Sequence, residues 1–267
     1  MTQIAPERFR PHGVAGRRSG HTDPLPPFAS VVCLVDRSPA GHAARQQAAA
    51  LATEGAEEII ATPRPGRGSS ALLDRCDGAD LLVLGASDEA IDLIHHTSLP
   101  VLLARSCAAG ATVTDRMLLA VDDESDPRAA AEIAAELAAG HCGTVAVVRA
   151  PRLNRVVERG TAAASRIVIQ AAGMLPEVYE QGVPAQRAIL AAVAAEDASL
   201  LVLPLGNTKS ARSRAAAIAR LVGCSVLLIP APPVTRTVDG DVDVVSPNAQ
   251  ADGRGVTVNT VTRPLVA

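Results

Sequence analysis

Short apolar runs alternate with Ala-rich segments along most of the chain, from about residue 29 to residue 232. Runs such as Leu200 to Leu205 have the length of a strand and carry no alternating polar positions. Such runs are typical of strands buried on both faces of a parallel sheet. The Ala-rich segments between them favour helices. The pattern therefore predicts an α/β fold built on a doubly wound parallel sheet.

The same order of elements is predicted twice. In the first half, Pro39 suits the first turn of a helix and Ser87 suits a helix cap. The expected strands there are 30–35, 59–61, 79–85 and 100–104, and the expected helices are 39–54, 70–76 and 87–96. In the second half the expected strands are 117–121, 144–148, 176–179, 199–205 and 224–229, and the expected helices are 126–139, 156–173, 184–196 and 213–221.

An internal repeat underlies this order. Val35-Asp36 at the end of the first strand corresponds to Val121-Asp122, and residues 80–85 correspond to 199–206. The segment 99–103 likewise corresponds to 224–228. We therefore expect two tandem units, about 29–106 and about 115–232. The first unit is about forty residues shorter, consistent with the loss of one strand and one helix.

The two ends of the chain differ from this pattern. Residues 1–28 are rich in Pro, Gly, Arg and His without a sustained period, which indicates a disordered arm. Residues 233–267 lose Leu and Ile and are expected to form a loosely ordered tail. Short Val-rich pieces at 242–245 and 256–261 leave edge strands open as an alternative.

The composition narrows the possible functions. The chain is 48% hydrophobic and 20% charged, with a net charge of −3, and has only three aromatic residues. Phe9 and Phe28 fall in the N-terminal arm, which leaves Tyr179 as the one expected ring in a core of Ala, Val, Leu and Ile. Functions that need stacked aromatics or a basic field, such as nucleic-acid binding, are disfavoured.

Targeting signals and cysteines point to the cytoplasm. No apolar run reaches the length of a membrane span, and the Arg-rich N-terminus has no apolar core of a secretory signal. The five cysteines have neither disulfide-framework nor metal spacing, so we expect reduced thiols that are mostly in the core. Cys107, in the linker between the units, is the best exception.

The ordered motifs resemble the universal stress protein family in its tandem two-domain form. The resemblance rests on the Val-Asp strand ends, on the second unit's Gly182-to-Ile189 segment, on the strand that ends before Gly206, and on the closing strands. It implies two doubly wound units related to the adenine nucleotide alpha hydrolase-like fold. It also implies that ATP or another adenine nucleotide binds in the second unit.

The resemblance carries a set of candidate nucleotide-binding residues. Ligands of open parallel sheets bind beyond the carboxyl ends of the strands, at the switch point, where Asp36 and Asp122 are expected. Each Asp could instead cap the following helix, and Pro184 could simply start one. The candidates are Asp122, Asp123, Pro184, Ala185, Gly206, Asn207, Lys209 and Ser213 in the second unit, and Asp36 in the first.

Both units depart from the family's phosphate loop. The second unit keeps Gly206 but lacks the later glycines, and Ser213 aligns with the family's Ser or Thr at the helix start. Lys209 and Arg212 supply charge for an anion, or with Arg214 they form a solvated loop and helix start. The first unit has Asp88-Glu89 where a phosphate would approach, so we expect it to bind no ATP and to be a structural or dimerising partner.

Other polar clusters suggest no chemistry. His95-His96 is better explained as cations at a helix C-terminus than as a metal site, because adjacent helical side chains diverge. The acidic run Asp122-Asp123-Glu124 lacks the glycine and terminal Glu of a calcium loop. We expect no metal and no catalytic residue, since no nucleophile elbow or Cys–His pair is visible.

We therefore expect a cytoplasmic stress-response regulator that acts by binding an unknown protein partner or by dimerising, with weak adenine-nucleotide binding in the second unit. The closing strands would pair the units into an intrachain pseudo-dimer, or pair two chains into a homodimer. The first alternative is an ATP-binding protein with nucleotide-controlled signalling. The second is a small α/β nucleotide hydrolase or transferase. Neither nucleic acid nor membrane is an expected partner.

Overall fold

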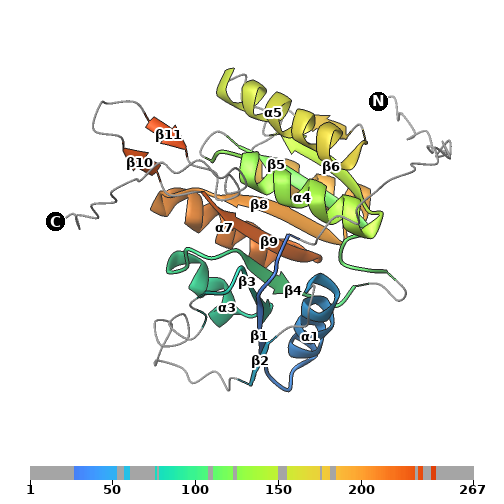
Figure 1. Cartoon of the computed structure of the whole chain (residues 1–267), viewed down its shortest axis with the longest axis vertical. Coiled ribbons are helices and arrows are strands. Elements are labelled where there is room, and N and C mark those ends of the chain that lie inside the picture. Colours follow the sequence, from blue (N-terminus) through green and yellow to red (C-terminus); the bar gives the residue numbers. More distant parts are fainter. Residues whose placement is uncertain are drawn as a thin grey trace, which may run out of the picture.

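The computed structural model describes residues 27–52, 57–60, 76, 78–107, 111–122, 125–149, 155–174, 176–180, 185–231, 234–236 and 242–244. Nine strands form one sheet in the order β2-β1-β3-β4-β9-β8-β5-β6-β7. Figure 1 shows the first unit below the second, with β4 and β9 at their boundary. The expected α/β fold with a doubly wound, mostly parallel sheet is confirmed.

The first unit contributes four strands to the sheet. Its strands are β1 (Val31–Val35), β2 (Glu57–Ile60), β3 (Leu81–Gly85) and β4 (Val101–Ala104). Its helices are α1 (Pro39–Leu51), α3 (Asp88–Asp92) and the 3₁₀ turn η1 (Leu93–His95). The expected helix 70–76 lies outside the described residues, apart from Cys76.

The second unit contributes five strands. They are β5 (Arg116–Val121), β6 (Thr144–Arg149), β7 (Glu177–Glu180), β8 (Leu200–Leu205) and β9 (Ser225–Pro230). The helices are α4 (Arg128–His141), α5 (Arg155–Ala172), α6 (Ala185–Glu196) and α7 (Lys209–Leu221). Among the described residues the first unit has no counterpart of β7, which agrees with its shorter sequence.

Local sequence explains where the helices begin. The Ser38 side chain accepts a hydrogen bond from the Gly41 N–H, with Pro39 in the first turn of α1. Ser87 caps α3 in the same way through the Ala90 N–H. The Thr208 side chain accepts from the Ala211 N–H, so α7 begins at Lys209. The expected start at Ser213 was therefore wrong, because Thr208 supplies an earlier cap.

Two helical layers cover the sheet. Alternate residues of β1 point to opposite faces: Val31, Cys33 and Val35 pack with one cluster, and Val32 and Leu34 with the other. Helices α1, α4 and α5 contribute to the first cluster, and α3, α6 and α7 contribute to the second. The small Ala side chains of these helices let them lie close to the Val and Leu side chains of the strands.

Phe28 corrects the expected composition of the core. It was placed in the disordered arm, but its side chain is 2% exposed and packs in the α1-side cluster. Burial of a large aromatic surface ties this residue to the fold. The core therefore holds an aromatic ring that composition alone assigned to the arm.

The two units join through an antiparallel strand pair. β4 and β9 pair antiparallel, whereas every other pair in this sheet is parallel. The carboxyl ends of the first unit's strands therefore lie at the opposite edge of the sheet from those of the second unit. Strands β1–β4 and β5–β9 consequently share one continuous sheet.

The region after β9 contains a second, small sheet. Strands β10 (Val234–Arg236) and β11 (Val242–Val244) pair antiparallel. β11 coincides with the Val-rich piece at 242–245, where an edge strand was the alternative to a loosely ordered tail, but it pairs with β10 in a separate sheet and not at an edge of the large one. The other Val-rich piece, 256–261, lies outside the described residues.

Candidate functional site

In the second unit the strand order reverses between β5 and β8. From β5 the sheet continues on one side to β6 and β7, and from β8 it continues on the other side to β9. The gap between β5 and β8 is therefore the switch point of this unit. Asp122 follows β5 and Gly206 follows β8, so the structure brings these two predicted residues to the same edge. Ala185 begins α6. Asp123 and Pro184 lie outside the described residues.

Protein side chains fill this switch point. The cavity that remains there is about 10 Å³, room for no more than one water molecule. Its walls come from β5, β8, α6 and α7. They are Ala120, Asp122, Ile189, Leu203, Pro204, Ala211, Arg214, Ala215 and Ile218. An adenine ring has no space among these side chains as they stand.

An ion pair closes the polar side of the switch point. The Arg214 guanidinium, from the second turn of α7, lies 3.6 Å from the Asp122 carboxylate. The two side chains are 27% and 18% exposed, so water screens their attraction less than at an open surface. Sequence reasoning placed Arg214 on a solvated helix start. No local signal shows that its side chain reaches back to the end of β5.

The start of α7 lacks the geometry of a phosphate loop. Thr208 caps the helix, and Ser213 lies within it on an exposed face. The Arg212 guanidinium donates through Nη1 to the carbonyls of Ile94 and Thr97, at 2.8 and 3.0 Å. Arg212, which was predicted to compensate the charge of a phosphate, therefore forms hydrogen bonds between the two units.

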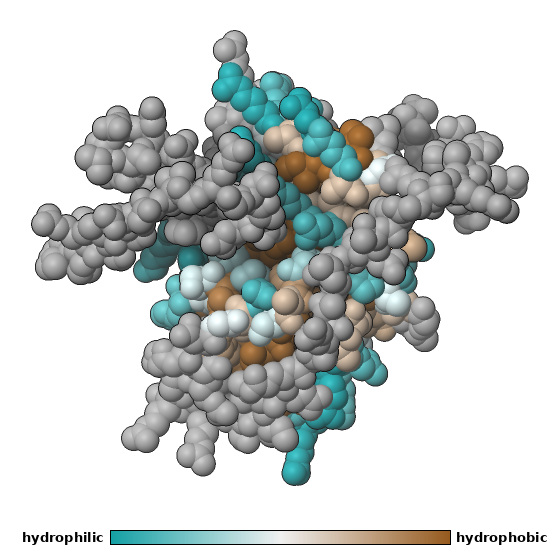
Figure 2. Space-filling view, in the orientation of Figure 1, coloured by the Kyte–Doolittle hydropathy of each residue, from teal (hydrophilic) through white to brown (hydrophobic). Residues whose placement is uncertain are grey.

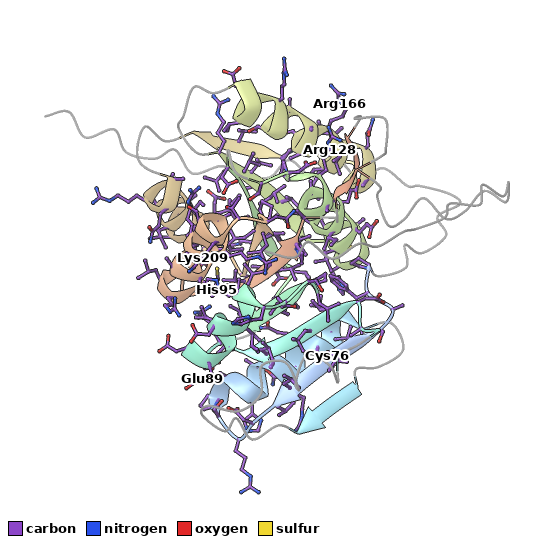
Figure 3. The ribbon with its side chains drawn as sticks, turned by 90° about the vertical axis from the view of Figure 1, so that its left-hand side faces the viewer. Cys76, Glu89, His95, Arg128, Arg166 and Lys209 are labelled. Carbon is purple, nitrogen blue, oxygen red and sulfur yellow. The ribbon has the colours of Figure 1, made fainter. Side chains whose placement is uncertain are left out.

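A hollow of about 860 Å³ remains beside this helix start, at the boundary of the units. Asn207, Lys209 and Ser213 line it from the second unit, and His95 and His96 line it from the first. Figure 3 shows Lys209 and His95 near each other across the boundary. The structure thus places three predicted residues, with the two histidines, around an open, polar surface.

The switch point of the first unit is closed by its own backbone. Asp36 accepts hydrogen bonds from the Ser38 N–H, at 3.0 Å, and from the Ser38 hydroxyl. These bonds hold the pKa of the Asp36 carboxyl below its usual value. A Cβ on Gly85 would lie 2.7 Å from the carbonyl carbon of Ala40, so the glycine lets α1 pack directly on the end of β3. Asp36 therefore builds the turn before α1.

The remaining candidate groups are the histidine, acidic and cysteine side chains outside the two switch points. Among the described residues no three His, Cys, Asp or Glu side chains gather into a group that could hold a metal ion. None of the five cysteines, all of which lie among the described residues, forms a disulfide: Cys33 and Cys76 are buried, Cys107 and Cys224 are partly exposed, and Cys142 is exposed. In the part of the chain that the structure describes, no helix is both long and apolar enough to cross a membrane.

These features define a doubly wound α/β protein with one nine-stranded sheet, in which its own groups close both switch points. The fold is that of the universal stress proteins, which confirms at the level of the fold what the motifs resembled. A universal stress protein from Archaeoglobus fulgidus matches with a TM-score of 0.50 at 18% identity, over 66% of this chain and 70% of that one.

Further comparisons agree with the fold. A functionally unknown protein from Pseudomonas aeruginosa matches with a TM-score of 0.51 at 16% identity, over 78% of this chain and 95% of that one. A universal stress protein in complex with cAMP matches 43% of this chain at 19% identity, with a TM-score of 0.38. At this level of similarity, the cAMP bound in that structure does not indicate a ligand of this chain. No protein-family model and no curated protein sequence matches the chain.

Proposed function

We propose that this chain is a regulatory protein of the universal stress type that acts by binding a protein partner and has no turnover chemistry of its own. The observation that carries the proposal is the closed switch point of the second unit, where Arg214 pairs with Asp122 over a cavity of about 10 Å³. A site of this kind is the place where an open parallel sheet holds its ligand. Because this ligand site is closed, we infer that the protein acts through contacts at its outer surface.

The first unit supports the same conclusion. Its switch point is covered by α1, and α3 begins with Asp88 and Glu89, which repel a phosphate at that helix start. Each unit of the tandem therefore disfavours a nucleotide at its switch point by a different means.

Apolar groups on the surface support partner binding. Ile169 on α5 is 43% exposed and Val178 on β7 is 45% exposed. Brown, apolar surface gathers beside α5 in Figure 2. β7 is also the outermost strand of the sheet, so one of its edges is not paired within the sheet. Such a strand with exposed apolar side chains offers a partner both hydrogen bonds and apolar contact.

Thermal unfolding of the full chain with ATP, AMP or cAMP tests the proposal. We expect no ligand-dependent increase in Tm, because a ligand stabilises only the state that binds it. An increase that saturates and is lost in Asp122→Ala would favour the nucleotide-controlled alternative. Sedimentation over a range of protein concentrations then shows whether the partner is a second copy of the chain.

A second candidate function is anion binding at the hollow beside the start of α7. Lys209, His95 and His96 line it, and the one acid on its wall, Asp92, is paired with Arg220 at 2.9 Å. Titration with inorganic pyrophosphate tests this candidate, and Lys209→Ala should weaken any binding. Metal-dependent ATP hydrolysis above that of a Lys209→Ala/Arg212→Ala variant would instead support the hydrolase alternative.

A further inference from the structure

A cavity of about 610 Å³ lies at the edge of the sheet opposite the second unit's switch point. It opens where β5, β8 and β9 begin and where β4 ends, so both units line it. Ser106 ends the first unit, Cys107 begins the linker, and Ser199 and Ser225 come from the second unit. We call it the junction pocket. Its volume is in the range of pockets that bind small molecules.

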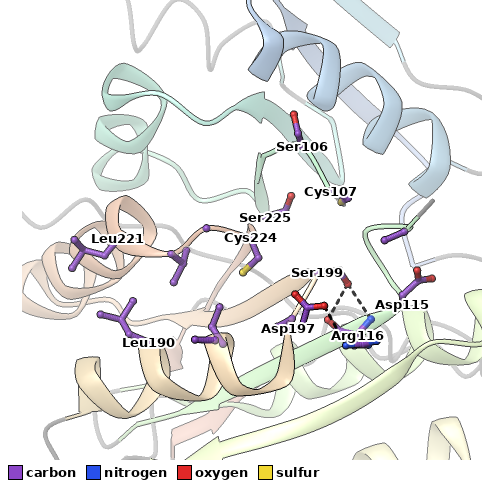
Figure 4. A pocket seen from close by; sticks show the side chains of 16 residues that line it. Ser106, Cys107, Asp115, Arg116, Leu190, Asp197, Ser199, Leu221, Cys224 and Ser225 are labelled. Atoms are coloured by element: carbon purple, nitrogen blue, oxygen red, sulfur yellow. Dashed lines mark hydrogen bonds and ion pairs between the residues drawn. The ribbon is translucent and has the colours of Figure 1, made fainter. Parts of the chain in front are cut away.

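The walls of the junction pocket are divided by polarity. Leu190 and Val193 of α6, with Leu221 and Val222 at the end of α7, form an apolar end. Figure 4 shows Leu190 and Leu221 at one end of the pocket, with Asp115, Arg116 and Asp197 at the other. Leu221 is 60% exposed, the most exposed large hydrophobic side chain among the described residues. This exposed surface at the rim is what an apolar ligand would cover.

The charged end carries more negative than positive charge. Two carboxylates, Asp115 and Asp197, face one guanidinium, that of Arg116. Arg116 lies 3.4 Å from the Asp197 carboxylate, and their side chains are 59% and 87% exposed, so this ion pair is weak. Asp115 accepts hydrogen bonds from the backbone and hydroxyl of Thr112, which fix its position.

The negative charge acts inside the pocket. After burial, which is the main cause, the charge of Asp115 raises the pKa of the Cys107 thiol. The nearby Arg105 guanidinium does not line the pocket, because it donates to the carbonyls of Ala219 and Cys224, at 2.6 and 3.1 Å. Two carboxylates against one guanidinium on its wall make the charged end favour a cation.

The middle of the pocket offers no further charge. Burial raises the pKa of the Cys224 thiol to about 11, so the thiol is neutral near pH 7. The Ser199 hydroxyl donates to the Val113 carbonyl and accepts from the Arg116 N–H, both at 3.0 Å. The Ser225 hydroxyl donates to Gln47 at 3.0 Å. The middle thus suits the uncharged part of a ligand.

We propose that the junction pocket binds a small amphipathic cation, with its ammonium group between Asp115 and Asp197 and its apolar body against Leu190 and Leu221. The ammonium group replaces the Arg116 guanidinium as the ion-pair partner of Asp197.

Three probes with the same alkyl chain test the charge preference by calorimetric titration into the full chain, with the two ions below their critical micelle concentrations and the alcohol below its solubility limit. We expect octylammonium to bind saturably, and about tenfold or more tightly than octanol or octanoate. Octanoate binding as tightly as octylammonium would overturn the proposal. So would the lack of saturable octylammonium binding.

Two variants locate the ligand. Asp197 has φ of 49°, a conformation that Asn also tolerates, so Asp197→Asn removes the charge and keeps the backbone. We expect it to weaken octylammonium binding about threefold to tenfold and to leave octanol binding unchanged. Leu221→Ser should weaken both probes. The matched control, Asp126→Asn at the far edge of the sheet, should weaken neither, and an unchanged octylammonium affinity in Asp197→Asn would overturn the proposal.

Discussion

Leu102 of β4 lies directly opposite Leu227 of β9, at the centre of the strand pair that joins the two units. The flanking pairs are Val101 with Leu228 and Leu103 with Val226. The internal repeat matches Val101 to Val226 and Leu103 to Leu228, so swapping the two halves turns one flanking pair into the other. In the internal repeat Leu102 corresponds to Leu227, so the pairing is self-complementary in the manner of a twofold interface. The junction therefore has the geometry of a dimer contact contained within one chain.

Truncation of the central leucine should weaken the whole chain. Leu102 is fully buried, so Leu102→Ala leaves a cavity in the middle of the sheet. We expect a loss of about 2–5 kcal/mol in the free energy of unfolding, measured by urea denaturation. Leu221→Ala, at an exposed position, is the control and should cost far less. A similar small loss in Leu102→Ala would contradict a packed junction.

Arg105 should be a second stabilising contact between the units. Its guanidinium donates to the Ala219 and Cys224 carbonyls near the end of α7, and its own carbonyl accepts from Gln47 at 2.6 Å. Arg105→Met keeps the apolar stem and removes the donors, so we expect a loss of about 1–3 kcal/mol in urea denaturation. Arg187→Met on the exposed face of α6 should change stability little.

The Asp122–Arg214 pair should show energetic coupling. Either single change to Ala leaves a partly buried charge without this partner, which we expect to cost about 1–3 kcal/mol. The double variant should be more stable than the sum of the single losses predicts, by about 1 kcal/mol. A double-mutant cycle by chemical denaturation measures this difference. Strict additivity would show that the two side chains do not interact.

Glu136 on α4 should destabilise the fold at neutral pH. Burial, and then the charge of Glu132, raise the pKa of the Glu136 carboxyl above its usual 4.5. The folded state therefore binds the proton of the Glu136 carboxyl more tightly than the unfolded state does. The stability that this proton adds is lost as the pH rises through the raised pKa. Because the side chain is partly exposed, Glu136→Gln should stabilise the protein at pH 7 by no more than about 1 kcal/mol. The gain should shrink below pH 4.5, as unfolding curves at both pH values would show.

Much of the fold follows from the sequence because its signals are local. Apolar runs specify the strands, and Ser38 and Ser87 cap the helices that follow them. The missed features depend on contacts across the fold. Arg214 meets Asp122 only when α7 packs on β8, and Phe28 is buried only when its cluster of strands and helices assembles.

The candidate site was predicted less well than the fold. Asp122 and Gly206 do lie at one switch point, but the space between them depends on how large the side chains of α6 and α7 are and where they point. The junction pocket was not predicted at all, because residues near 106, 116, 197 and 224 meet only through the β4–β9 pairing.

Calorimetric titration of ATP, with Mg²⁺, into the full-length protein tests the closed switch point most directly. With Arg214 on Asp122 and a cavity of about 10 Å³, we predict no saturable heat up to about 1 mM ATP. Saturable binding in the micromolar range that disappears in Asp122→Ala would contradict the account.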